Sequence, residues 1–407
     1  MSTETPDFET VGQRVRDGIF ESSVFRLTVN PPQGWRLLVG RELAQLDPDA
    51  IVGLAAADST AYVILSPEYL PNDIPDSFLE SQRGNFFTTL QDQFESISRS
   101  DTVEFNVCGK TVKFEHFVTS APQFQYYCGV ELFDDLKIMC SAWSLGSDSD
   151  QLRESVRAAV GSVSLIPQQD TDKLRQEELA RTDIQSSIGR DFSLRRSVYR
   201  NFRTGVVWTR PKSFWKVNPG DAAKQVDPNC ELFCENILAG IYLTVVSDEL
   251  EDLTLDLNSH HSFVIENTFE EDHAVHDTVP QKLMIDGAAA LVSEGDDDTD
   301  DIPIRYRIIT IIRNGWAYQI TVSGYTGRME QYKREVDAAI AGFAFLGRSL
   351  KPVNMTPKGI DDLWLGLKLD LSPSSWKPRD VTPPQLRNLG RVVNFQRGFR
   401  EHPESPF

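Results

Sequence analysis

The sequence predicts an α+β protein made of two tandem α-β-α sandwich domains with antiparallel sheets, related by internal duplication and followed by a partial third repeat. The chain matches itself at one fixed shift, its apolar runs are joined by hairpin turns, and its helices have one apolar face. A length of 407 residues is also too great for one hydrophobic core. We therefore expect a first domain over residues 1–168, a second over 169–348, and a truncated third repeat or docking tail over 349–407.

The self-similarity appears when the chain is shifted by 180 residues. The segment VFRLTVNPPQGW, which ends at Trp35, then falls on TGVVWTRPKSFW, which ends at Trp215. Near the other end of each copy, residues 138–165 fall on residues 318–345. The preceding dipeptides, Asp-Asp in one copy and Asn-Gly in the other, are typical of tight turns between antiparallel strands. The middle of each copy does not register, which indicates insertions there.

In the first copy, the apolar pattern predicts a helix, three strands, a second helix, three more strands and a closing helix. The helices are expected at Phe8–Ile19, Asp76–Ile97 and Asp150–Val160, and the strands at Phe25–Val29, Ala50–Leu54, Ala61–Ser66, Thr111–Val118, Phe124–Phe133 and Lys137–Trp143. In the long middle helix, apolar residues recur at helical spacing and form one buried stripe. Hairpin connections favour an antiparallel sheet that the helices cover.

The second copy repeats this pattern, and a third copy begins near Asp362. For the second copy we expect helices at Asp172–Gln185 and Met329–Ala341 and strands at Gly205–Thr209, Leu232–Asn236, Ile241–Val246, Ala288–Ser293, Ile304–Ile312 and Trp316–Ser323. The third copy supplies two strand-like segments, Leu365–Leu371 and Arg391–Phe395. Two strands cannot bury a face alone, so the tail is expected to pack on the second domain or on a neighbouring subunit.

Composition narrows the class of function. The formal net charge of −19 argues against a nucleic-acid partner, because the phosphate backbone would be repelled. No stretch approaches the roughly 20 apolar residues of a transmembrane helix, and the polar N-terminal residues lack a signal peptide's apolar core, so a cytoplasmic location is expected. The five cysteines lack zinc-finger spacing and are expected to act as small apolar residues. No cofactor is expected.

The segment EEDHAVHD contains the candidate metal ligands Asp272, His273, His276 and Asp277. It lacks the HExxH frame and a third ligand at fixed spacing, so a solvated loop is the competing interpretation. The acidic run EGDDDTDD at residues 294–301 lacks the ligand spacing of an EF-hand and is expected to be a solvated loop between strands.

Two basic stretches are candidate partner-binding regions. The first holds Arg195, Arg196, Arg200 and Arg203 with aromatic residues interleaved, and the second holds Arg391, Arg397 and Arg400. Mixed basic and aromatic residues can bind single-stranded nucleic acid, but in so acidic a chain they favour docking onto the protein's own acidic surface or an acidic partner. Trp35, Trp215 and Trp376 recur once per copy and are expected at core positions.

The order of these elements resembles the PsbP-like superfamily, which includes DcrB-like bacterial proteins. The most similar stretch is NGWAYQITVSGYTGRMEQYKREVDAAIAGFAF, in which Trp316, Tyr325, Tyr332 and Val336 stand in typical places. The resemblance covers each copy along its length and rests on pattern. It implies an α-β-α sandwich that binds other proteins, as assembly factors and chaperones for secreted effectors do.

The sequence shows no P-loop, nucleophile elbow or dinucleotide-binding glycine pattern. The predicted function is therefore a non-enzymatic protein-binding module, an adaptor or a chaperone or assembly factor within a larger complex. Its partner is expected to be another protein, either a secreted effector or a second copy of the chain. The alternative is a metal-dependent enzyme that uses the cluster between Glu270 and Asp277.

Overall fold

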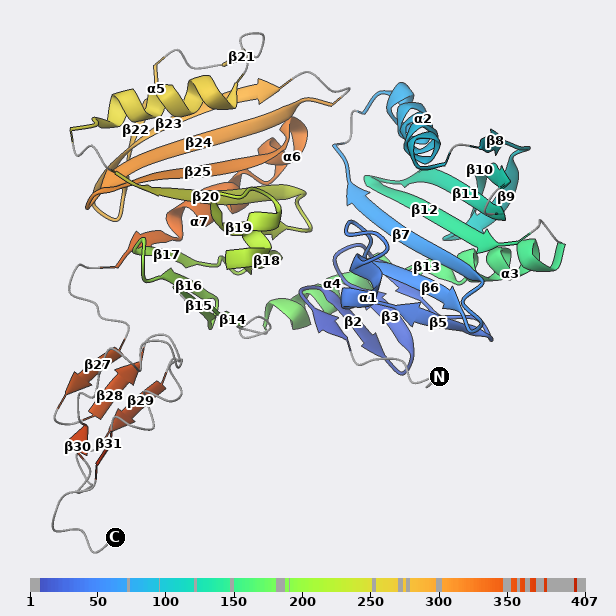
Figure 1. Cartoon of the computed structure of the whole chain (residues 1–407), viewed down its shortest axis with the longest axis horizontal. Coiled ribbons are helices and arrows are strands. Elements are labelled where there is room, and N and C mark those ends of the chain that lie inside the picture. Colours follow the sequence, from blue (N-terminus) through green and yellow to red (C-terminus); the bar gives the residue numbers. More distant parts are fainter. Residues whose placement is uncertain are drawn as a thin grey trace, which may run out of the picture.

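The structure is a computed structural model of the whole chain. It describes residues 8–71, 74–94, 96–120, 123–146, 150–180, 187–189, 191–250, 254–269, 274–275, 279–297 and 302–346, and then five short strands between residues 353 and 400. Each half of the chain forms one five-stranded and one eight-stranded antiparallel sheet (Figure 1). None of the described helices is both long and apolar enough to span a membrane.

The first half contains a small sheet in the order β1-β2-β3-β4-β13 and a large sheet in the order β5-β6-β7-β12-β11-β10-β8, with β9 paired to β10. The small sheet consists of β1 (Glu9–Thr10), β2 (Gln13–Arg16), β3 (Ile19–Ser22), β4 (Leu27–Val29) and β13 (Val163–Leu165). The large sheet consists of β5 (Trp35–Leu38), β6 (Val52–Ala56), β7 (Ala61–Tyr69), β8 (Ile97–Arg99), β9 (Val103–Val107), β10 (Lys110–Ser120), β11 (Gln123–Phe133) and β12 (Leu136–Leu145). The helices are α1 (Gly40–Ala44), α2 (Asp76–Gln93), α3 (Asp150–Val160) and α4 (Gln168–Leu179).

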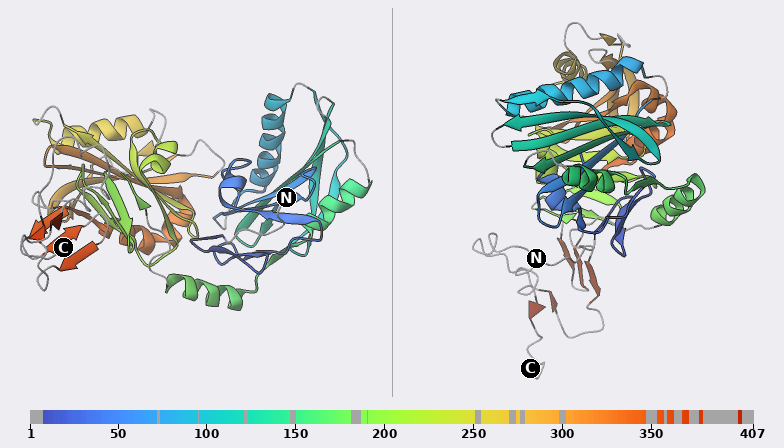
Figure 2. Two further views of the ribbon diagram at one scale, coloured as in Figure 1. Left: turned by 60° about the horizontal axis from the view of Figure 1, so that its bottom comes forward. Right: turned by 90° about the vertical axis from the view of Figure 1, so that its right-hand side faces the viewer.

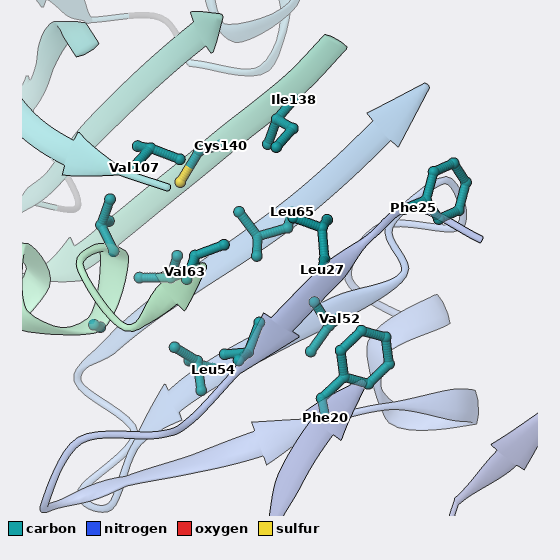
Figure 3. Packing of buried hydrophobic residues seen from close by; sticks show 14 of the residues in the cluster. Phe20, Phe25, Leu27, Val52, Leu54, Val63, Leu65, Val107, Ile138 and Cys140 are labelled. Atoms are coloured by element: carbon teal, nitrogen blue, oxygen red, sulfur yellow. The ribbon is translucent and has the colours of Figure 1, made fainter. Parts of the chain in front are cut away.

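The main core of the first half lies between the two sheets. Phe20 and Leu27 of the small sheet pack against Val52 and Leu65 of the large sheet, and all four are almost fully buried (Figure 3). Helix α3 closes the same core with Val156. Helix α2 covers the opposite face of the large sheet (Figure 2). The expected helix layer is therefore present on one face, whereas the other face is shared by a helix and a second sheet.

The second half repeats this strand order. Its small sheet runs β14-β15-β16-β17-β26 and its large sheet runs β18-β19-β20-β25-β24-β23-β21, with β22 paired to β23. The strands are β14 (Ser187–Ile188), β15 (Phe192–Arg195), β16 (Val198–Asn201), β17 (Val206–Thr209), β18 (Trp215–Pro219), β19 (Cys230–Asn236), β20 (Ile241–Glu249), β21 (Ala274–Val275), β22 (Gln281–Ile285), β23 (Ala288–Asp297), β24 (Ile304–Arg313), β25 (Trp316–Tyr325) and β26 (Phe343–Phe345). The helical segments are η1 (Gly220–Gln225), α5 (Leu257–Thr268), α6 (Thr326–Gln331) and α7 (Lys333–Ala341).

Equivalent residues occupy equivalent places in the two halves. Trp35 and Trp215 are the first residues of β5 and β18. In the turns that follow, the backbone N–H of Asp49 donates to Asp47 Oδ1 at 2.9 Å, and that of Asn229 donates to Asp227 Oδ1 at 2.7 Å. The paired residues of the β11–β12 and β24–β25 hairpins also match, with two-residue turns in both.

The prediction of a helix at Phe8–Ile19 is wrong, because this segment forms β1, β2 and the start of β3. Asp17 and Gly18 have φ values of 51° and 77° and make the two-residue turn between β2 and β3. An Asp-Gly pair with left-handed φ values is typical of a β-hairpin, and this signal outweighs the helical spacing of the neighbouring apolar residues. The closing helix expected over Met329–Ala341 is interrupted at Tyr332, which separates α6 from α7.

The described residues after position 346 include a three-stranded sheet of β27 (Val353–Thr356), β28 (Gly359–Asp362) and β29 (Leu367–Asp370). A further pair is β30 (Lys377–Pro378) with β31 (Phe399–Arg400). Of the two strands expected in this tail, β29 lies within Leu365–Leu371, whereas Arg391–Phe395 is outside the described residues. A third copy was expected to begin near Asp362, and the first described strand after residue 346 begins at Val353.

Candidate functional site: a groove in the second half

A cavity of about 600 Å³ opens between strand β22 and helix α7 of the second half. One side is lined by the consecutive residues 281–286, so the groove follows the length of β22. The other side is lined by Lys333, Asp337, Ile340 and Ala341, whose spacing places them on one face of α7. A volume of this size is within the usual range of ligand-binding clefts.

The floor of the groove is apolar, and its strand side combines apolar and polar residues. Val292, Ile309 and Phe343 contribute from β23, β24 and β26. On β22, Leu283 is 38% exposed and Met284 is 63% exposed. Apolar side chains that gather in an exposed concave surface are typical of an interaction site.

Charged residues flank these apolar walls. The guanidinium of Arg307 forms ion pairs with Glu294 across the sheet and with Asp337 on α7, the latter at 2.9 Å. Lys282 and Lys333 lie at the rim and make no ion pair with another described residue. The rim therefore carries positive charge that the described part of the chain leaves available to a bound group.

Strand β22 is at the edge of its sheet. It pairs with β23 on one side, and no other described strand pairs with it. Its first four residues are exposed. Backbone N–H and C=O groups at the edge of a sheet can pair with another extended segment.

The sequence-predicted metal ligands Asp272, His273, His276 and Asp277 lie outside the described residues. Within the described residues, no group of three or more His, Cys, Asp or Glu side chains could hold a metal ion. Cys128, Cys140, Cys230 and Cys234 are buried, Cys108 is partly buried, and all five are free thiols.

The acidic run at residues 294–301 was expected to be a solvated loop, and this is wrong for its first half. Glu294 and Asp296 lie in β23 and form ion pairs with Arg307 and Arg305 on β24. Each carboxylate lies directly opposite its arginine in the antiparallel ladder. Opposite charges at such cross-strand positions stabilise the sheet. The remaining residues of the run, 298–301, are outside the described part of the chain.

The candidate arginines of the second half do not converge on one patch. Arg195 and Arg200 lie on the face of the small sheet opposite to the buried Leu194 and Tyr199. Arg196 is exposed in the turn before β16, and Arg203 is exposed in the turn after it, with its guanidinium 5.6 Å from the Trp316 ring. Burial lowers the pKa of Arg200.

Of the three candidate arginines of the tail, the structure describes one. Arg400 is the last residue of β31, while Arg391 and Arg397 lie outside the described residues, as does Trp376.

A buried carboxyl group lies where the small and large sheets of the second half meet. Asn201 Nδ2 donates to Glu231 Oε2 at 2.9 Å, and Thr204 Oγ1 donates to Glu231 Oε1 at 3.2 Å. Burial raises the pKa of Glu231 from 4.5 to about 7, because desolvation disfavours the charged form more than these hydrogen bonds favour it. The cluster joins residues that are up to 30 positions apart in the chain, and no local sequence motif marks it.

No family model matches the sequence, and no curated protein matches it. Solved structures that align with parts of the chain include the cyanobacterial PsbP, CyanoP, of Synechocystis sp. PCC 6803, at 14% identity and a TM-score of 0.28, covering 36% of this chain and 91% of that one. The PA94 protein of Pseudomonas aeruginosa, described as a putative regulator, aligns at 10% identity and a TM-score of 0.23, covering 33% and 84%.

A longer alignment is found with the type VI secretion immunity protein TplEi of Pseudomonas aeruginosa. It covers 79% of this chain and 95% of that chain, at 9% identity and a TM-score of 0.22. At these TM-scores the alignments do not assign the chain to a family. The functional proposal for this chain therefore rests on the geometry of the groove.

Proposed function

We propose that this chain is a non-enzymatic protein-binding module, an adaptor or assembly factor of a larger complex, and that its second half receives the partner in the groove beside β22. The observation that carries the proposal is a groove with an apolar floor, bordered by a strand edge and by the exposed Leu283 and Met284. Among the described residues, the lining includes no histidine, cysteine or serine, and the Glu294 and Asp337 carboxylates are paired with Arg307. This lining is suited to holding a partner.

Site-specific photo-crosslinking tests the proposal. A photo-reactive amino acid at position 284, which is 63% exposed in the groove, should give discrete adducts in native lysate. The matched control is position 226, where Val226 is 55% exposed and outside the groove lining. Equal adducts from both positions, or none from position 284, would contradict the proposal.

We also propose that the two halves are copies of one ancestral domain, and that the boundary between them follows α4. The identical strand orders support the first statement. The third sheet supports a partial third copy. In each copy, the second strand of the meander begins six residues after the first and the third begins eight residues after the second, as the starts at 13, 19 and 27, at 192, 198 and 206, and at 353, 359 and 367 show.

A further inference from the structure

The first half has a site equivalent to the groove, and aromatic rings fill it. The strands β9, β10 and β11 correspond to β22, β23 and β24. In this correspondence Phe105, which pairs with Val112, is equivalent to Leu283, which pairs with Ala290. Phe105 is 1% exposed, and its ring centroid is 4.8 Å from that of Phe114 and 5.6 Å from that of Tyr127.

Another cross-strand pair on the same face of the sheet also differs between the two halves. His116 and Tyr127 face each other on β10 and β11 as a stacked pair with ring centroids 4.6 Å apart. Glu294 and Arg307 occupy the equivalent positions on β23 and β24. A ring stack that excludes water is thus replaced by an ion pair.

The closing helix also shows the difference. In the first half, the guanidinium of Arg157 on α3 lies 5.8 Å from the Phe105 ring. The equivalent residue on α7 is Asp337, which pairs with Arg307 at the groove wall. The space that the first half fills with its own side chains is therefore open in the second half.

From this comparison we infer that the groove binds an extended segment of a partner protein, which adds to the edge of β22 where no other described strand pairs and places an aromatic side chain where the first half has Phe105. This inference rests on the proposed protein-binding function and specifies its partner. At about 3.3 Å per residue, the side formed by residues 281–286 accommodates a strand of about six residues.

The charges at the rim specify a further feature of the segment. Lys282 and Lys333 are exposed and form no ion pair with another described residue. Because neighbouring side chains of a strand alternate, a carboxylate next to the aromatic residue would lie on the side of Lys282, and Lys333 would attract the segment from α7. The segment is therefore an acidic one with an aromatic anchor.

The first half provides a probe with these properties. A fluorescent peptide with the sequence of residues 101–109, carrying Cys108→Ser, contains Phe105 beside Glu104 in a segment that is extended in the structure. We expect the full-length protein to bind it with a Kd on the order of 10–100 µM in fluorescence polarisation. Phe105→Ala in the peptide should weaken binding about tenfold or more, because the ring is the anchor.

Variants of the full-length protein test the position. Leu283→Phe introduces the ring that the first half has at this place and should weaken peptide binding about tenfold or more. Val226→Phe, outside the groove, should leave it unchanged. Lys333→Glu should weaken it, and the loss should shrink as salt is raised. Melting curves establish that each variant is folded, and Met284→Asp replaces Leu283→Phe if the latter is not.

The outcomes separate this inference from the proposed function. No peptide binding at 1 mM by the folded wild-type protein, or equal binding by Leu283→Phe, would overturn the inference. Crosslinking at position 284 would in that case still support protein binding through another kind of contact. A dimer that Leu283→Phe dissociates would assign the groove to a second copy of the chain and would also overturn it.

Discussion

Trp35 and Trp215 begin equivalent strands but differ in their surroundings. Trp215 is fully buried, and its ring stands edge-on to Trp208 with centroids 6.0 Å apart. Trp35 is partly exposed, and its Nε1 donates to Ser155 Oγ at 3.2 Å. Both residues were expected at core positions, and only Trp215 is fully buried.

Trp215→Ala should therefore lower the free energy of unfolding by about 3–5 kcal/mol, the usual cost of removing a buried large aromatic side chain. Trp35→Ala should cost clearly less, because part of its surface already contacts water. Urea denaturation of both variants measures the difference. Equal losses of unfolding free energy in the two variants would show that burial does not determine how much each tryptophan stabilises the protein.

Glu231 should make stability depend on pH near neutrality. Its folded-state pKa of about 7 lies above the ordinary 4.5, so its stabilising effect is complete below about pH 4.5 and is lost as the pH rises through 7. Glu231→Gln removes the charge with little change of shape. Between pH 5 and pH 8, the unfolding free energy of the variant relative to the wild type should rise by about 2–3 kcal/mol.

Denaturation at a series of pH values tests this expectation. A difference between the two proteins that stays constant from pH 5 to pH 8 would show that the carboxyl group titrates near its ordinary value.

At the scale of elements, α6 connects the two halves through one buried arginine. Arg328 is 1% exposed, and its guanidinium donates to Leu238 O at 2.7 Å, to Ala239 O at 3.1 Å and to Asp135 Oδ2 at 3.1 Å. It also lies 5.1 Å from the Tyr69 ring centroid. A planar guanidinium can make these contacts together, whereas an ammonium cannot.

Arg328→Met should lower the free energy of unfolding by about 2–4 kcal/mol, because two buried carbonyl groups lose their donor. Arg328→Lys should restore only part of this loss. Asp135→Asn is the matched control, and it should cost less, since it leaves the two carbonyl contacts in place. Full rescue by lysine in a denaturation experiment would mean that charge alone matters at this position.

Helix α4 lies after the expected end of the first domain at residue 168, yet it packs on that half. Arg175 donates from Nε to Ser23 O and from a terminal nitrogen to Val24 O, both at 2.8 Å. Glu178 accepts from the backbone N–H of Gly12 at 3.0 Å. These contacts join the helix to the turns of the small sheet.

At the scale of the whole molecule, this docking predicts where the chain can be divided. A protein ending after Ala180 should be more stable than one ending after Pro167, by about 2–4 kcal/mol, because the shorter one loses the Arg175 and Glu178 contacts. Chemical denaturation of the two truncated proteins gives the comparison. Equal stabilities would place the boundary before α4, as the sequence alone predicts.

Local sequence pattern was sufficient for much of the fold. Helix α3 begins and ends where the periodicity of apolar residues predicts, and the paired strands β11–β12 and β24–β25 lie close to their expected ranges. The pattern failed for β2 and β3, where a short amphipathic segment is compatible with either period and the Asp-Gly turn decides between them.

The antiparallel sheets and the closing helix of the first half could be predicted from the sequence, because both depend on residues close together in the chain. The duplication stays a prediction, which rests on one constant shift of the sequence. Only the tertiary structure revealed the groove. Its equivalence to the Phe105 site depends on a hairpin that is displaced by two residues from the 180-residue shift, as the pairing of Leu283 with Ala290 and of Phe105 with Val112 shows. The groove is the space that the side chains of β22, β23, β24 and α7 leave unfilled. A local sequence pattern cannot predict this space, because it depends on how side chains from four separated segments pack together.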